Sequence, residues 1–254
     1  MSSLHLYPNS RPRGSARLWS RYMRVYDRLC ESVEYQKMQK RVGDVLEAPA
    51  RGMGVDIGCG TGNSTLHLTG PDRHTHGVDS LYEALIRAQP KFNMPDQGRI
   101  DFHCMDSLGF LSMLGEGSVD RVVAVNTLYT MENAKSALEE IFRVLEPGGR
   151  LVFVDLLPGF KPGRVLKANL AWRWEANSVG KALYWIAYDL AKSIELLAIN
   201  SLINREAKRG IFHLRPSDEY LQILTEIGFI SKAPEIIYAN QAALYVADKP
   251  AEIK

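Results

Sequence analysis

Short apolar runs alternate with segments of helical period from about Met53 to Asp155. The apolar runs are GMGVDIG, HTHGVDS, RIDFHCMD, DRVVAVNTLY and RLVFVDL, and each is too short for a helix. Segments between them, such as AKSALEEIFRVL, place apolar residues three and four positions apart, as an amphipathic helix does. This alternation predicts five parallel strands joined by helical crossovers in an α/β sheet.

Local signals refine two of these crossovers. The residues Asn63 to Leu68 predict the start of a helix after a glycine-rich turn, and the Gly70-Pro71 pair ends it. Ser80 and Glu83 form a capping-box pattern, which predicts a second helix that begins directly after Ser80.

The alternation stops at Pro158, and residues 158–215 predict two or more helices separated near NSVGK. An apolar stripe with helical spacing predicts a packed face for the second of them: Leu183, Ile186, Ala187, Leu190, Ile194, Leu197 and Ala198. A further helix at RPSDEYLQILTEIGF resumes the core, and PEIIYA and AALYVADK predict an antiparallel pair at the sheet edge. The sequence therefore predicts seven strands, with a helical insertion before the sixth.

Composition and charge narrow the class of protein. The chain has 254 residues, of which 46% are hydrophobic and 24% charged, so it can bury a sizeable core. The net charge of +2 argues against a nucleic-acid surface, which would carry a basic stripe. Three cysteines and six histidines show no metal-ligand spacing, so we expect neither disulfides nor a metal site.

The sequence predicts neither a secretory signal at the first residues nor a membrane-spanning helix. The first residues, which we take as a loose arm, lack the apolar core and cleavage site of a secretory signal. The apolar stretch from Ala182 to Ile203 is interrupted by Asp189, Lys192 and Glu195, which a spanning helix would not tolerate. We expect a cytoplasmic protein without a transmembrane segment, either a monomer or a homodimer.

The stretch VDIGCGTGNST holds the most specific chemistry. A glycine turn between a strand and a helix lets a ligand approach the backbone closely. Gly58, Gly60 and Gly62 depart from the G-x-G-x-x-G spacing of dinucleotide sites, because the third glycine comes one position early. Three carboxylates, Asp56, Asp79 and Asp106, lie at or near strand ends, where open parallel sheets bind their ligands.

Five successive motifs carry a resemblance to a known family: VDIGCGTGNST, GVDSLYEAL, DFHCMDSL, VDRVVAVNTLY and ALEEIFRVLEPGGRLVFVD. Together they resemble the class I S-adenosylmethionine-dependent methyltransferases, in particular the group similar to the ubiquinone and menaquinone biosynthesis enzymes. The match covers roughly Arg51 to Leu157 and resumes weakly at LQILTEIGF. It implies a Rossmann-like, mostly parallel sheet of seven strands that ends in an antiparallel hairpin, with a helical cap after the fifth strand and an N-terminal helical arm.

The resemblance implies a cofactor, S-adenosylmethionine, and its contacts. The backbone of Gly58 to Gly62 would hold the methionine part, Asp79 the ribose diol and Asp106 the adenine amino group, while Asn126 and Thr127 would close the site behind the sulfonium. The implied cofactor residues are Asp56, Gly58, Cys59, Gly60, Gly62, Asn63, Asp79, Ser80, Met105, Asp106, Ser107, Asn126, Thr127 and Tyr26. Asp56 equally suits a structural role in the turn. Because the cofactor carries an ammonium and a sulfonium and no phosphate, acidic side chains suit the site.

The same reasoning divides the chain into four parts and names acceptor residues. We expect residues 1–45 to form an arm and lid, 46–157 the cofactor core, 158–215 a helical cap around the acceptor pocket, and 216–254 the rest of the sheet. The expected substrate is a small, partly apolar molecule in contact with Tyr22, Tyr129, Trp185, Tyr188 and His213. His213 and Tyr129 are the candidate catalytic groups, with Glu132 as a further candidate base, for an acceptor that must lose a proton.

Other functions remain open from the sequence. The chain could consume S-adenosylmethionine as its substrate, by cyclisation or alkyl transfer that releases methylthioadenosine. It could also be a non-catalytic partner subunit that binds the cofactor. A dinucleotide oxidoreductase is disfavoured by the glycine spacing.

Overall fold

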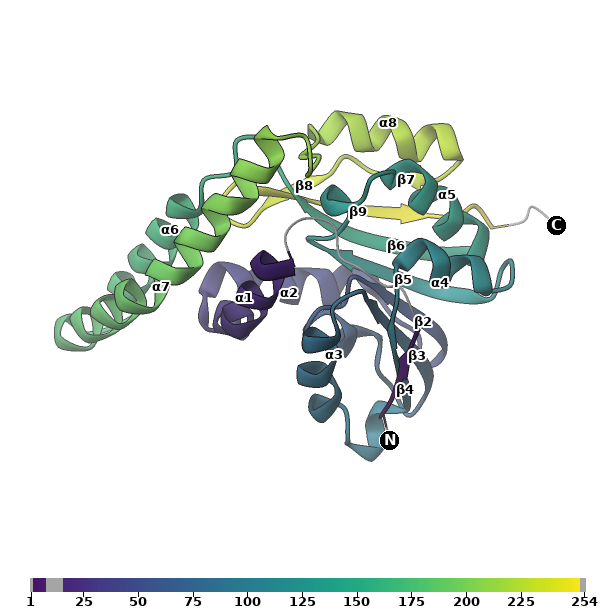
Figure 1. Ribbon diagram of the computed structural model, residues 1–254, viewed down its shortest axis with the longest axis horizontal. Coiled ribbons are helices and arrows are strands. Elements are labelled where there is room, and N and C mark those ends of the chain that lie inside the picture. The colour runs from purple at the N-terminus through teal and green to yellow at the C-terminus, as the bar shows by residue number, and fades with distance from the viewer. Residues whose placement is uncertain (1, 8–15, 252–254) are drawn as a thin grey trace.

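One sheet of nine strands organises the computed structural model, which describes residues 2–7 and 16–251 (Figure 1). The strands are β1 (Ser2–Leu6), β2 (Arg51–Ile57), β3 (Asp72–Asp79), β4 (Arg99–Cys104), β5 (Val119–Val125), β6 (Leu145–Leu156), β7 (Ile230–Ser231), β8 (Glu235–Ile237) and β9 (Ala242–Asp248). Their order is β1-β4-β3-β2-β5-β6-β9-β7, with β8 also paired to β9. The pairs from β1 to β6 are parallel and those of β9 antiparallel, which confirms the predicted α/β class and its antiparallel C-terminal edge.

Helices cover both faces of the sheet because its central strands are apolar on both sides. The helices are α1 (Ala16–Tyr26), α2 (Val33–Leu46), α3 (Tyr82–Ala88), α4 (Ser107–Met113), α5 (Ala134–Val144), α6 (Pro162–Glu175), α7 (Val179–Lys208) and α8 (Ser217–Ile227). Val123 and Val125 of β5 pack with residues of α1 and α2, whereas Val122 and Ala124 pack with α5 and α8. Alternate residues of one strand thus enter two cores, as in doubly wound folds.

The N-terminal residues do not form the loose arm that the sequence predicts. Ser2–Leu6 is the edge strand β1, parallel to β4, with Leu4 packed against the apolar cluster that contains Ile100 and Phe102. Ser3 donates to Asp101 of β4, and the exposed ring of His5 stacks on His103 of β4, contacts that a hydropathy pattern does not reveal. The rest of the predicted arm, residues 8–15, lies outside the described residues.

The crossover after β2 is also different from the prediction. In place of a helix from Asn63, the chain makes turns and a single 3-10 segment at Thr65–Leu68. Left-handed glycines occupy the first half of this crossover, and Pro71 begins the approach to β3, so no room remains for a full helix.

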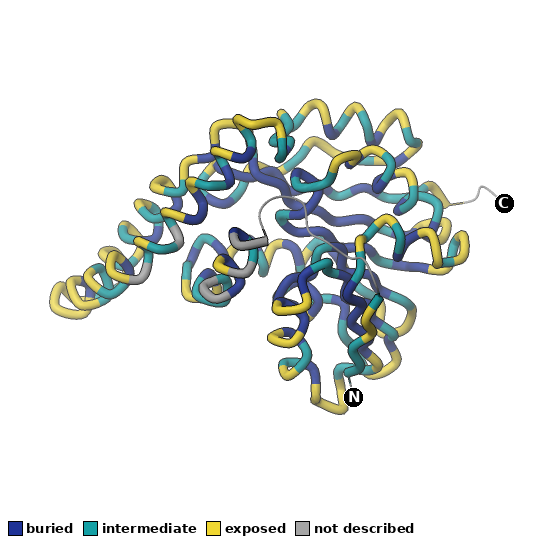
Figure 2. The backbone as a smooth tube through the Cα atoms, in the orientation of Figure 1, coloured by how far each residue is buried: buried dark blue, intermediate teal, exposed yellow. Residues whose placement is uncertain are grey.

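The predicted insertion forms α6 and α7, a long helical pair that projects from one end of the sheet (Figure 1). The stripe expected to pack on α7 is largely open to solvent: Leu183, Leu190 and Ile194 are 57%, 46% and 71% exposed. The buried residues, Ala182, Ile199 and Ile203, lie on another face of the helix. Figure 2 shows exposed positions concentrated at the projecting end, where the pair has left the body of the protein.

None of the described helices is both long enough and apolar enough to cross a membrane.

Candidate functional site

A cavity of about 650 Å³ opens where β2, β3, β4 and β5 end, between these strand ends and α1. Its volume falls within the range of roughly 300 to 1,000 Å³ that is usual for small-molecule sites. The chain leaves β2 toward β3 on one side and β5 toward β6 on the other, so the cavity lies at the switch point of the sheet. It is lined by Trp19, Tyr22, Met23, Tyr26, Gly58, Gly60, Asp79, Ser80, Leu81, Met105, Asp106, Ser107, Leu108, Val125, Asn126, Thr127, Tyr129, Thr130, Met131, Glu132, Asn133 and Ala137.

Three left-handed glycines form the turn at the floor of the cavity, and two of them, Gly58 and Gly60, line it. The φ angles of Gly58, Gly60 and Gly62 are 65°, 53° and 80°, a region that favours glycine. A Cβ atom on Gly58 would lie 2.1 Å from Oγ1 of Thr127, and one on Gly62 would lie 2.7 Å from the ring of Phe92. A Cβ atom on Gly60 would meet nothing within 4 Å, so Gly60 presents bare backbone to the cavity.

Asp79 fixes the glycine turn to the end of β3. Its Oδ2 accepts a hydrogen bond from the backbone N–H of Gly60 at 2.9 Å, and its Oδ1 accepts one from Leu81 at 2.8 Å. Burial raises the pKa of Asp79, and the backbone N–H donors oppose that rise. The predicted capping box of Ser80 and Glu83 does not form, because Asp79 satisfies the Leu81 N–H that begins α3.

The segment after β4 forms a second polar wall. Met105, Asp106 and Ser107 all line the cavity. Asp106 caps α4 by accepting a hydrogen bond from the N–H of Gly109 at 2.8 Å, which holds the carboxylate at the cavity rim.

The side chain of Asn126 places a buried, unpartnered oxygen atom in the cavity wall. Its φ of 56° is left-handed, a conformation that asparagine tolerates better than most residues. Its backbone N–H donates to the carbonyl of Val154 at 2.7 Å, whereas its side-chain oxygen is buried with no hydrogen-bond partner among the described residues. A buried acceptor of this kind fits a ligand that carries a donor.

The cavity lining is acidic. Among the described residues that line it are the carboxylates of Asp79, Asp106 and Glu132, and none of these described residues is Lys, Arg or His. A dinucleotide would bring phosphates next to these carboxylates without a basic side chain to pair with them. The lining therefore suits a cationic ligand.

The opposite wall is apolar and aromatic. Trp19, Tyr22, Met23 and Tyr26 of α1 face the segment that runs from Tyr129 to Asn133. Burial raises the pKa of the Tyr129 hydroxyl far above its ordinary value, so that it stays protonated at neutral pH. Sequence reasoning missed Met23 and Met131; extending the strand-end rule by a few residues beyond Tyr129 would have found Met131.

Residues 158–215 do not line this cavity, in contrast to the predicted cap around an acceptor pocket. Trp185 and Tyr188 lie on the projecting part of α7, where Trp185 packs on Arg173 and the Tyr188 hydroxyl donates to Glu31 at 3.2 Å. His213 is half-buried, and its backbone N–H donates to the carbonyl of Tyr129 at 2.7 Å. The reason is that α1 lies between the insertion and the cavity.

The insertion instead supports the aromatic wall from behind. Asn200 of α7 accepts a hydrogen bond from the Tyr22 hydroxyl at 3.3 Å. The buried ring of Phe212 contacts Trp19 and Tyr129, with ring centroids 5.6 Å and 5.7 Å away. Residues far from the cavity thus set the positions of both of its apolar sides.

Four predicted cofactor residues lie behind the cavity wall: Asp56, Cys59, Gly62 and Asn63. The Cys59 side chain is buried, and its burial raises the thiol pKa. Asn63 donates to the Tyr35 hydroxyl at 3.2 Å and accepts from Lys91 at 3.1 Å, so its side chain braces the turn.

Two buried carboxyl groups also hold the strand ends. Asp56 accepts a hydrogen bond from the Thr65 hydroxyl at 2.6 Å, and Asp155 accepts one from Tyr220 at 2.7 Å. Burial raises the pKa of each to about 7. For Asp56, the structure favours the structural role in the turn over contact with a ligand.

Replacing Asp56 with asparagine should change how the free energy of unfolding depends on pH. The pKa of Asp56 is raised from 3.8 to about 7, so between these values the folded protein holds more protons than the unfolded chain. This group therefore lowers stability as pH rises from about 4 to about 7 and has a constant effect above that. Relative to wild type, Asp56→Asn should gain stability across this window, on the order of a few kcal/mol. Denaturant titrations at several pH values measure the difference, and a difference independent of pH would contradict the assignment.

An acidic cavity with a glycine turn at the switch point of this sheet is what the resemblance to the class I S-adenosylmethionine-dependent methyltransferases implies. Residues 55–153 match the family model described as "Methyltransferase domain". The match begins in β2 and ends in β6, so it contains the glycine turn, Asp79, Asp106 and Asn126.

Individual relatives agree with this assignment. The chain is 34% identical over 125 residues to the O-methyltransferase cnsE of Penicillium expansum, covering 48% of this chain and 44% of that one. It is 32% identical over 123 residues to the demethylmenaquinone methyltransferase of Lactococcus lactis, covering 47% of this chain and 46% of that one. The chain thus spans about half the length of the curated relatives it matches.

The fold is similar to solved structures over most of its length. The N-methyltransferase NodS from Bradyrhizobium japonicum, in complex with S-adenosylhomocysteine, superposes with a TM-score of 0.62 at 18% identity. The alignment covers 92% of this chain and 97% of NodS, so the likeness of fold extends beyond the matched domain.

Proposed function

We propose that this protein transfers a methyl group from S-adenosylmethionine to a small, partly apolar acceptor. The observation that carries the proposal is the lining of the cavity, with Asp79, Asp106 and a bare glycine turn on one side and, on the other, an aromatic wall that also holds Glu132. The cationic cofactor suits the first side, and an apolar acceptor suits the second.

The residues present fit the cofactor. The bare backbone at Gly60 gives a cradle that a Cβ atom would fill, and the unpartnered oxygen of Asn126 is an acceptor for an ammonium group. By the family resemblance, Asp79 would bind the ribose diol and Asp106 the adenine amino group, between Met105 and Ser107. The bound cofactor supplies an electrophilic methyl group on a sulfonium.

The chain's own contribution to catalysis is positioning and exclusion of water. Trp19, Tyr22 and Tyr26 form a wall that holds the acceptor against the methyl group and keeps water out. An in-line displacement with a good leaving group gains most of its rate from such positioning. Residues 46–157 would then be the cofactor core, with α1 as the lid and the insertion as its support.

If the acceptor must lose a proton, two substitutions distinguish the candidate bases in the cavity, Tyr129 and Glu132. Tyr129→Phe should lower kcat by less than about tenfold, because a hydroxyl with so high a pKa does not act as a base at neutral pH. Glu132→Gln should lower kcat at least about ten times more than Tyr129→Phe, since Glu132 is the carboxylate on the acceptor side of the lining. Initial rates for both variants, with cofactor affinity as the control for folding, test this. A greater loss in Tyr129→Phe would overturn the assignment.

The reaction product tests the proposed function. Protein incubated with methyl-labelled S-adenosylmethionine and pools of small metabolites should release S-adenosylhomocysteine and place the label on one acceptor, whose identification gives the methylated atom. Release of methylthioadenosine would show instead that the cofactor is the substrate. Tight cofactor binding with neither product in any pool would show a binding subunit.

A further inference from the structure

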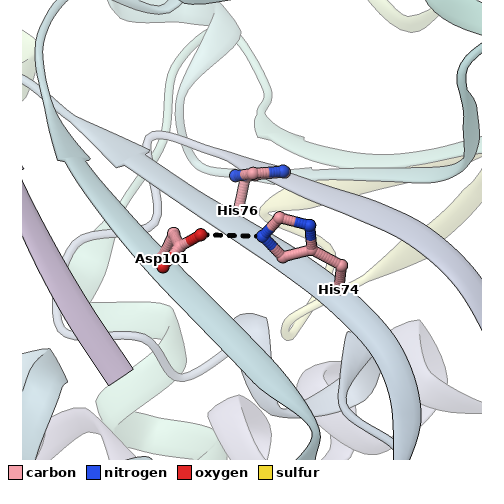
Figure 3. Close-up of side chains that lie close together, drawn as sticks. All are labelled: His74, His76 and Asp101. Carbon is pink, nitrogen blue, oxygen red and sulfur yellow. Dashed lines mark hydrogen bonds and ion pairs between the residues drawn. The ribbon is translucent and has the colours of Figure 1, made fainter. Parts of the chain in front are cut away.

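We propose that His74, His76 and Asp101 form a binding site for a divalent transition-metal ion of the zinc type, separate from the cofactor cavity. His74 and His76 stand two positions apart on β3, so their side chains share one face of the sheet. Asp101 of β4 lies directly beside His76 in the strand register. Figure 3 shows the three side chains together, and their ligand atoms all lie within 4.8 Å of one another.

The donor set matches the chemistry of such an ion. Two imidazoles and one carboxylate are ligands that Zn²⁺ accepts, at about 2.0 to 2.2 Å from each atom. Nε2 of His74 lies 2.8 Å from Oδ2 of Asp101, so the hydrogen bond drawn in Figure 3 joins two of the ligand atoms. The ion takes the place of the proton on Nε2 of His74, and that proton moves to Nδ1 of the same neutral imidazole. The His74 side chain is 28% exposed, which gives the ion a route from solvent.

The surroundings orient the ligands. Nδ1 of His76 is 3.0 Å from Nε2 of His103, and this bond leaves Nε2 of His76 as the free ring nitrogen. A hydrogen bond on the outer ring nitrogen fixes the orientation of a metal-binding histidine, and His103 supplies it here. Nδ1 of His103 is itself buried and has no hydrogen-bond partner among the described residues. The hydrogen bonds of the described fold therefore leave at least one ring nitrogen of this cluster without a partner.

The N-terminal strand closes the site on its outer side. The Ser3 hydroxyl donates to Asp101, and the ring of His5 stacks on His103 with centroids 5.0 Å apart. Arg99 donates to Oδ2 of Asp101 at 2.9 Å, but its side chain is 67% exposed and free to turn toward solvent. A bound ion would fasten β3 to β4 directly and to β1 through Asp101.

Zn²⁺ binding to the full-length protein tests the site. Wild type should bind one Zn²⁺ per chain in a calorimetric titration, and at about 100 times the dissociation constant Zn²⁺ should raise the melting temperature by roughly 5 to 10 °C. His74→Gln should weaken binding at least tenfold and remove the shift, and because His74 is partly exposed this variant should fold. His67→Gln is the matched control, since His67 lies outside the cluster, and it should bind as wild type does.

Two further measurements make the result decisive. Asp101→Asn should weaken Zn²⁺ binding as His74→Gln does, and S-adenosylhomocysteine affinity should stay unchanged in His74→Gln, because none of the three ligands lines the cavity. No binding by wild type, or equal affinity in wild type and His74→Gln, would overturn the proposal.

Discussion

Replacing Asp79 with alanine should weaken S-adenosylhomocysteine binding by about 1.5 to 3 kcal/mol, or roughly 10- to 150-fold. The variant loses the carboxylate that we assign to the ribose diol. It also frees the N–H groups of Gly60 and Leu81, which Asp79 now holds at 2.9 Å and 2.8 Å, so the glycine turn becomes less well ordered. Calorimetric titration with S-adenosylhomocysteine gives the affinity.

Asp72→Ala is the matched control for this variant. Asp72 begins the same strand, β3, at the end away from the cavity, and its exposed carboxylate lies 3.5 Å from Arg51. It should bind S-adenosylhomocysteine as wild type does. Circular dichroism shows whether Asp79→Ala is folded, and a folded Asp79→Ala variant with wild-type affinity would show that this carboxylate takes no part in the site.

Gly58→Ala should destabilise the protein by roughly 2 to 5 kcal/mol. An alanine at a φ of 65° costs about 1 to 2 kcal/mol in backbone strain. The added methyl group would also lie 2.1 Å from Oγ1 of Thr127, so either Thr127 or the turn must move. Denaturant unfolding of the purified variant measures the loss.

Two other glycines separate strain from steric clash. Gly148, with a φ of 81°, and Gly60, with a φ of 53°, both have open space where a Cβ would go. Alanine at either position should cost only about 1 to 2 kcal/mol of stability. Gly60→Ala should in addition weaken cofactor binding, because its methyl group enters the cavity, whereas Gly148→Ala should not. Equal stability of the Gly58 and Gly148 variants would contradict the proposed packing at the turn.

The parallel core was predictable because its strands are buried on both faces. A run such as VVAV is apolar on both faces, and the glycine turn and the acids at the strand ends follow from chain order alone. The predictions fail where a contact joins distant segments. Ser3 and His5 read as polar residues of a loose arm until β4 supplies their partners, and the stripe on α7 reads as a packed face although that helix projects into solvent.

The candidate site was likewise predictable only in part. Residues adjacent to strand ends, such as Asp79, Asp106 and Asn126, line the cavity as predicted. Trp185 and His213 do not, because the position of an inserted helix pair depends on packing against α1, which the order of motifs does not encode. The proposed metal site has no sequence signature for a related reason: Asp101 comes from a neighbouring strand, so it shows no ligand spacing with His74 and His76.

Separate titrations with S-adenosylhomocysteine and with NAD test the central claim most directly. Calorimetric titration of the wild-type protein with S-adenosylhomocysteine should give one site per chain, and titration with NAD under the same conditions should give no heat, because the acidic lining offers no basic side chain to a pyrophosphate. Tight binding of NAD together with no heat from S-adenosylhomocysteine would contradict the account.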